Sequence, residues 1–157
     1  MTIQTLKAEL ASARTYLDRV LDQVGDRWDT QVYSDKAAWT AGQLLTHLAI
    51  TDQGQSNTVK SVAAGQELIP ADFDLERYNK RSVEKRADMT PEQARKMLDD
   101  TRAEFNNWLD QQDESILEKS GRHGSMNIYT IEQFLQVMAG HERAHADDIA
   151  RTLAIPL

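Results

Sequence analysis

The sequence has no cysteine and little proline or glycine: three prolines and seven glycines in 157 residues. The missing cysteine excludes disulfides, thiolate nucleophiles and metal sites built on paired thiolates, so reactive chemistry must come from histidines and carboxylates. The low proline and glycine content argues against disordered linkers. A chain of this length buries roughly 70% of its unfolded surface and needs no structural metal to form a core. We therefore expect one domain over residues 1–157, in which any bound metal is functional.

Long apolar runs and an excess of positive charge are also missing. No apolar run approaches the ~20 residues that a membrane-spanning helix needs. The N-terminal segment MTIQTLKAEL lacks the basic start and apolar core of a secretory signal. The formal net charge is −7, and the densest basic stretch, residues 77–86, is interrupted by Glu84. We therefore expect a cytoplasmic protein with neither a membrane partner nor a nucleic-acid partner.

Four segments carry apolar residues at alternating spacings of three and four, which is typical of amphipathic helices. The first covers residues 3–24, and Gly25 is expected to end it. Each of the other three begins with a Thr-x-x-Gln capping box, in which the threonine hydroxyl and the glutamine amide satisfy main-chain N–H groups at the helix start. These helices are predicted at residues 40–65, 90–112 and 130–153.

The longest connection, residues 66–89, joins the second and third helices and is long enough to recross the bundle. If it does, the second and third helices run parallel, and the fourth runs antiparallel to the second. The predicted fold is then all-α, a four-helix bundle with up-down-down-up topology and a long crossover between helices 2 and 3. The link at residues 113–129 could also cross in extended form, so loop length alone leaves this topology open.

Two histidines lie one turn apart on the apolar face of the fourth helix. Imidazoles four residues apart, as in His141 and His145, can bind one metal ion through one nitrogen each. The alternative is a pair of core histidines satisfied by hydrogen bonds.

A third histidine, His47, lies on or beside the inward face of the second helix. At about 1.5 Å per residue, His47 is about 10 Å from the start of its helix and His145 about 12 Å from the end of its own. Antiparallel helices bring the two to one level, whereas parallel helices keep them apart. We predict a metal site of His47, His141 and His145 with open positions, suited to zinc or nickel.

Polar residues continue the inward face of the second helix beyond His47, where a core helix would carry leucine. Thr51, Asp52 and Gln55 could line a cavity around the metal, or they could face water at a helix edge. One of them, or Asp148, could accept the second N–H of a ligand histidine, as ligating imidazoles usually require.

The segment HERAH also fits the H-E-x-x-H pattern of zinc metalloproteases, with Glu142 as the general base. Few residues follow His145, and none of them is a histidine or glutamate that could serve as the third ligand. A protease is therefore not expected. In a hydrolase that activates water, Glu142 or Asp52 would be the candidate base.

Three further residues receive structural interpretations. His123, in the loop GRHGSMN, has no helical partner at ligand spacing and is expected at the surface. Trp39 and Trp108 are expected to be packing anchors rather than substrate platforms.

In their order and spacing, these features resemble the DinB superfamily. The resemblance covers nearly the whole chain and is carried by Trp39 and Thr40 before the second helix, His47 in THL, the FDLERYN stretch around Tyr78 and Asn79, and HERAHADDI with His141 and His145. It implies an up-down-down-up bundle, a zinc or nickel ion on the three histidines and a homodimer. Tyr78 and Asn79 join Thr51 and Gln55 as candidates for lining the cavity.

The family also includes YfiT-like metal-dependent hydrolases and the metal-binding domain of mycothiol-dependent maleylpyruvate isomerases. Its characterised members include thiol transferases and isomerases that use bacillithiol, mycothiol or glutathione. The resemblance thus leads to the hypothesis of a thiol S-transferase or isomerase in which the metal activates a low-molecular-weight thiol. Two alternatives stay open: a hydrolase that uses metal-activated water, and a non-catalytic, stress-related dimeric binding module.

Overall fold

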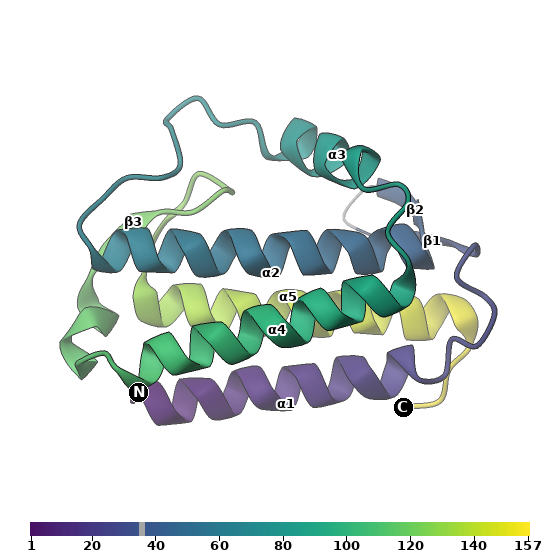
Figure 1. Ribbon diagram of the computed structural model, residues 1–157, viewed down its shortest axis with the longest axis horizontal. Coiled ribbons are helices and arrows are strands. Elements are labelled where there is room, and N and C mark those ends of the chain that lie inside the picture. Colours follow the sequence, from purple (N-terminus) through teal and green to yellow (C-terminus); the bar gives the residue numbers. More distant parts are fainter. Residues whose placement is uncertain (35–36) are drawn as a thin grey trace.

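The computed structural model describes residues 1–34 and 37–157, and these are dominated by helices (Figure 1). The long helices are α1 (Ile3–Leu21), α2 (Ala41–Ala63), α4 (Pro91–Asp110) and α5 (Ile131–Leu153). The shorter elements are the strands β1 (Gln31–Ser34), β2 (Ala37–Thr40), β3 (Ser120–Arg122) and β4 (Ile128–Thr130), the helix α3 (Leu75–Lys85) and the 3-10 helix η1 (Glu114–Glu118). No helix in the described residues is long and apolar enough to cross a membrane.

Local sequence signals explain where the long helices begin. The three predicted capping boxes are present at α2, α4 and α5. At α2, the Thr40 hydroxyl accepts the main-chain N–H of Gln43 at 3.1 Å, and the Gln43 side chain accepts that of Thr40 at 3.0 Å. A further box, Thr2 with Thr5, begins α1. At its other end, α1 stops at Leu21 rather than near residue 24.

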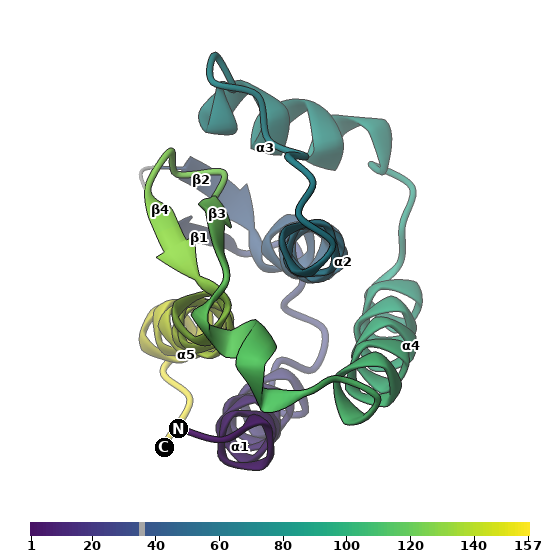
Figure 2. The same ribbon diagram turned by 90° about the vertical axis from the view of Figure 1, so that its left-hand side faces the viewer.

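The bundle has the predicted up-down-down-up topology. In Figure 1, α1 and α5 run in one direction and α2 and α4 in the other. The most extensive helix pairings are α1 with α5 and α2 with α4, and α2 also packs against α5. The crossover at residues 66–89 contains α3, which lies across the outer side of α2 (Figure 2). The predicted long crossover between the second and third bundle helices is therefore confirmed.

Two short antiparallel hairpins precede α2 and α5, in segments for which the sequence predicts no helix. β1 pairs with β2, with Val32 opposite Trp39, and β3 pairs with β4, with Gly121 opposite Tyr129. The second hairpin packs closely on α2. A Cβ atom added to Gly121 would lie only 2.5 Å from Cγ2 of Val62. Glycine at this position therefore allows the hairpin to approach the helix.

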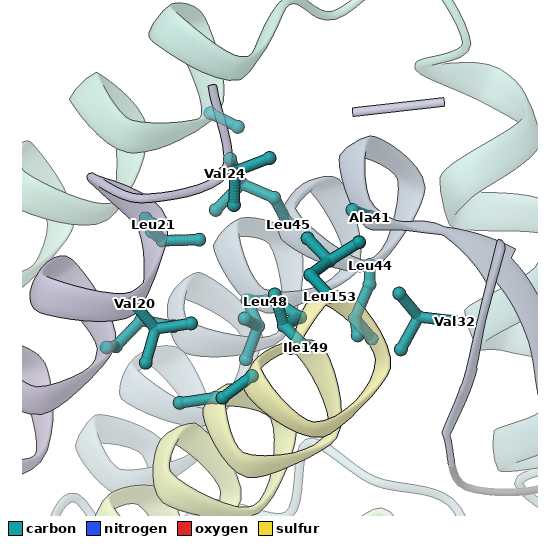
Figure 3. Packing of buried hydrophobic residues seen from close by; sticks show 14 of the residues in the cluster. Val20, Leu21, Val24, Val32, Ala41, Leu44, Leu45, Leu48, Ile149 and Leu153 are labelled. Carbon is teal, nitrogen blue, oxygen red and sulfur yellow. The ribbon is translucent and has the colours of Figure 1, made fainter. Parts of the chain in front are cut away.

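The apolar core is divided into two clusters along the bundle. Figure 3 shows the cluster at the end where α2 begins and α5 finishes, with Leu44, Leu48 and Ile149 among its buried residues. The other cluster includes Leu6, Phe105 and Phe134. Each long helix carries one buried charged side chain between its residues of the first cluster and its residues of the second. These four residues are Arg14, Asp52, Arg102 and Glu142. We call these four residues the ionic layer.

Candidate metal centre

The three histidines predicted as ligands come together between α2 and α5. Nε2 of His141 lies 3.3 Å from Nε2 of His47 and 2.8 Å from Nε2 of His145. One ligand atom from each residue lies within 4.8 Å of the others. Metal–nitrogen bonds of 2.0–2.1 Å in tetrahedral geometry separate two ligand nitrogens by about 3.3 Å. The spacing and the all-imidazole donor set therefore fit a late divalent ion such as zinc or nickel.

The three ligand candidates differ in their access to solvent. His47 and His145 are buried, whereas His141 is half-buried. The antiparallel run of α2 and α5 (Figure 1) explains why they meet, because His47 near the start of α2 comes level with His141 and His145 in the second half of α5. The pair His141 and His145 needs only helical geometry, since residues four apart share one face.

A serine from β1 orients His145. The Ser34 hydroxyl lies 2.8 Å from Nδ1 of His145 and donates a hydrogen bond to the Asp148 carboxylate. A hydroxyl that donates to a carboxylate accepts from the ring, so the proton of His145 belongs on Nδ1 and Nε2 is the ligand nitrogen. Asp148 is one of four candidates that the sequence offers as direct partner of a ligand histidine, but the structure interposes Ser34, which lies in a strand that the sequence does not predict.

A threonine stands in the corresponding position beside His47. The Thr51 hydroxyl lies 3.3 Å from Nδ1 of His47, one helical turn away on α2. This contact also directs Nε2 of His47 toward the other two rings. On the other side, the Trp39 ring lies 4.8 Å from the His47 ring and packs on the apolar core. Trp39 is thus a packing residue, as predicted, that also flanks the three-histidine cluster.

A cavity of about 430 Å³ opens onto the three-histidine cluster. Its walls come from α2, α5, the crossover with α3 and the tip of the β3–β4 hairpin. The lining includes His47, His141, Thr51, Gln55, Val137, Phe73, Tyr78, Asn79 and His123. Among the described residues, no aspartate, glutamate, lysine or arginine lines it. The three-histidine cluster therefore faces a mostly apolar chamber with a few neutral polar groups.

The prediction that His123 lies at the surface is wrong. His123 is half-buried, and its ring lies 5.4 Å from those of Tyr129 and Phe134. Its Nε2 atom is 3.2 Å from the side-chain nitrogen of Gln55. Burial lowers the pKa of His123 below its ordinary value. The unpredicted hairpin causes the difference, because it folds the loop back over α2.

Asp52 neither lines the cavity nor faces water, the two alternatives that the sequence leaves open for it. Asp52 is buried in the ionic layer, where Oδ1 accepts from Arg102 at 2.8 Å and Oδ2 lies 3.5 Å from Arg14. Glu142 lies there too, with Oε1 accepting from Arg14 at 2.6 Å and from Arg102 at 2.8 Å. Burial by itself would lower the pKa of Arg14, but the hydrogen bond and charge of Glu142 raise it overall. Both candidate bases are therefore engaged by arginines rather than facing the cavity.

The second tryptophan lies far from this site. Trp108 stacks on Phe105 with ring centroids 5.8 Å apart and packs against the second core cluster. It is a packing anchor, as the sequence predicts.

Solved structures with the same fold are related only distantly in sequence. YfiT from Bacillus subtilis, described as a probable metal-dependent hydrolase with an unusual four-helix bundle topology, is 17% identical with a TM-score of 0.75. The match covers 96% of this chain and 85% of YfiT. A mycothiol-dependent maleylpyruvate isomerase is 15% identical with a TM-score of 0.76, and the match covers 95% of this chain but 61% of the isomerase.

A third similar structure is the colibactin self-resistance protein ClbS, solved in complex with double-stranded DNA. It is 13% identical with a TM-score of 0.73, over 99% of this chain and 98% of ClbS. No protein of curated function matches the chain in sequence. A sequence model of the DinB superfamily, however, matches residues 9–149. Because this match covers most of the chain, the protein belongs to the DinB superfamily.

Proposed function

We propose that this protein is a metal-dependent thiol S-transferase or isomerase. In this proposal His47, His141 and His145 hold one divalent ion, zinc or nickel, and a low-molecular-weight thiol is the cosubstrate. When bound, the ion supplies Lewis-acid chemistry that lowers the pKa of a thiol beside it. Since the chain has no cysteine, the reacting sulfur must come from a small molecule.

The observation that carries the proposal is the chamber beside the histidines, whose described lining contains no carboxylate. Activation of water is commonly assisted by a general base, and the two candidate bases, Asp52 and Glu142, are paired with arginines. A thiol has an ordinary pKa of about 8.5, against about 15.7 for water. Thiol activation therefore demands less from the surrounding side chains, which favours thiol over water chemistry.

The remaining side chains have supporting roles in this proposal. Ser34 and Thr51 orient the rings of His145 and His47, which keeps their Nε2 atoms directed at one point. The apolar walls exclude water from the reacting groups. Tyr78 and Asn79 from α3 would contact the substrate from the crossover side.

The test is a thiol-consumption assay on protein loaded with zinc or nickel. Bacillithiol, mycothiol and glutathione are each supplied with a model electrophile such as 1-chloro-2,4-dinitrobenzene. We expect at least one thiol to react faster than with His47→Ala. Gln53→Ala is the matched control, because Gln53 is exposed on the same helix, and it should keep the wild-type rate. A wild-type rate no greater than that of His47→Ala overturns the proposal.

Hydrolysis is the second candidate, favoured by the likeness to YfiT. It predicts turnover of an ester or amide without any thiol, and the same metal-loaded protein can be assayed for this. A non-catalytic binding module predicts instead that the purified protein carries no stoichiometric metal and that His141→Ala leaves ligand and partner binding unchanged. Cytoplasmic location, a homodimer and the lack of a nucleic-acid partner stay predictions of this proposal.

A further inference from the structure

Gln55 and His123 form a polar pair in the cavity, away from the metal centre. Gln55 lies eight residues beyond His47 on α2, which is about 12 Å of helix. His123 reaches it from the tip of the β3–β4 hairpin, and the two side-chain nitrogens lie 3.2 Å apart. Both residues line the chamber that opens onto the metal centre.

The hydrogen bonds of His123 indicate which of its nitrogens carries the proton. Nδ1 accepts the main-chain N–H of Ser125 at 3.0 Å, and the Ser125 hydroxyl lies 2.8 Å from the same atom. A ring nitrogen that accepts a main-chain N–H has no proton of its own, so the neutral ring is protonated on Nε2. Burial, which lowers the pKa of His123, favours this neutral form.

The orientation of the Gln55 amide follows from that tautomer. The Nε2–H group of His123 needs an acceptor, and the only acceptor in the Gln55 amide is its oxygen. Amide oxygen and nitrogen positions are assigned from the hydrogen-bond network, so the oxygen belongs on the His123 side. The amide NH₂ group of Gln55 then remains to donate to a molecule in the chamber.

The chamber around this pair suits an uncharged ligand. Its described lining combines apolar side chains such as Ile50, Phe73 and Val137 with neutral amides and hydroxyls. A charged group placed there, away from the metal, would lose its hydration without an opposite charge to compensate it. A neutral oxygen acceptor on an apolar body would keep one hydrogen bond and bury its remaining surface.

We propose that Gln55 and His123 form a recognition site for the carbonyl or amide oxygen of an uncharged, largely apolar molecule. Gln55 donates the hydrogen bond, and His123 holds the amide in the donating orientation. The site rests on the proposed function only in that the bound molecule is the electrophilic substrate. Binding can be measured without any thiol.

The test compares two small probes on zinc-loaded protein by NMR titration: phenylacetamide, which carries the amide oxygen, and toluene, which lacks it. We expect Gln55→Leu to weaken phenylacetamide binding by about three- to tenfold, the value of one hydrogen bond, with little change for toluene. His123→Phe should act in the same direction, since phenylalanine keeps the ring packing against Tyr129 and Phe134. Gln53→Leu, the same substitution at an exposed position of α2, should change neither affinity.

Three results would overturn the site: no binding of phenylacetamide to the wild type, no loss in Gln55→Leu, or an equal loss for both probes. The tautomer is checked separately by long-range ¹H–¹⁵N spectra of the histidine rings, where protonation of His123 on Nδ1 would also overturn it. Selective phenylacetamide binding in a protein without thiol-dependent turnover keeps this site and refutes the proposed thiol function. Thiol-dependent turnover in a protein that binds the two probes without selectivity supports the thiol function and refutes this site.

Discussion

The hydroxyl of Ser34 lies 2.8 Å from Nδ1 of His145, although 111 residues separate them in sequence. The same hydroxyl donates to Asp148, one turn further along α5. The first hairpin is therefore joined to α5 by a polar contact that fixes the orientation of the His145 ring, one of the three candidate ligands. Ligand rings held in this way bind metals more tightly than rings that rotate.

Replacing Ser34 by alanine should weaken metal binding without unfolding the protein. The variant loses the acceptor for the Nδ1 proton of His145, and the loss of such an outer contact typically costs ten- to a hundredfold in affinity. Competition with a chromophoric chelator measures the zinc affinity. Ser12→Ala, which removes an exposed hydroxyl on α1, is the control and should match the wild type. Equal affinities for Ser34→Ala and wild type would contradict the role of Ser34.

Removing any one of the three clustered histidines should abolish stoichiometric metal. His47→Ala, His141→Ala and His145→Ala are compared with His123→Ala, which removes the one histidine outside the cluster. Zinc at a hundred times its Kd should stabilise the folded state by about 2.7 kcal/mol through mass action. We expect this gain in wild type and His123→Ala and its loss in the other three, as measured by thermal unfolding and metal analysis. Full metal content in His141→Ala would exclude the three-histidine site.

Glu142→Ala should strongly destabilise the fold. The change removes one of the two buried carboxylates that contact both Arg14 and Arg102, so that the two buried guanidinium groups share Asp52. Breaking a buried ion pair from one side typically costs about 3–5 kcal/mol. Urea unfolding measures the loss. Glu132→Ala, on the same helix but half-exposed beside the N-terminal amine, should cost less than about 1 kcal/mol. Similar losses in both variants would argue against a tightly coupled ionic layer.

Gly121→Ala should destabilise the β3–β4 hairpin, because its Cβ atom would collide with Val62. Overpacking of this kind costs about 1–3 kcal/mol. Val62→Ala in the same chain should relieve part of the cost, which a double-mutant cycle measures. Gly140→Ala is the control: it lies in α5 with nothing within 4 Å and should stabilise the helix by about 0.5–1 kcal/mol. Additive effects of the Gly121 and Val62 changes would refute the close contact.

His123 should make stability depend on pH in the acidic range. Its pKa is lowered by burial in the folded state, whereas the unfolded chain has the ordinary value of about 6.5. The unfolded state then binds the extra proton first, so stability is lost as the pH falls below about 6.5 toward the folded pKa. Urea titrations in the presence of a chelator measure the free energy of unfolding at each pH. This free energy should fall more steeply with decreasing pH for wild type than for His123→Phe. Parallel curves would contradict the burial of a neutral ring.

The sequence by itself determined the features that depend on local geometry. The capping boxes at Thr40, Thr90 and Thr130 begin helices because their hydrogen bonds close within four residues. The spacing of His141 and His145 places both on one helix face, and the helix rise brings His47 to their level once α2 and α5 run antiparallel. These statements need only the geometry of a single helix and one choice of topology.

Tertiary structure alone decided what the other polar residues contact. Ser34 and His123 reach the site on hairpins of three or four residues per strand, too short to show a period in the sequence. Asp52 and Glu142 belong to the ionic layer because arginines on α1 and α4 pair with them there. Such partners lie far apart in the chain, and only the packing of four helices, not the spacing within one, determines which side chains share a buried space.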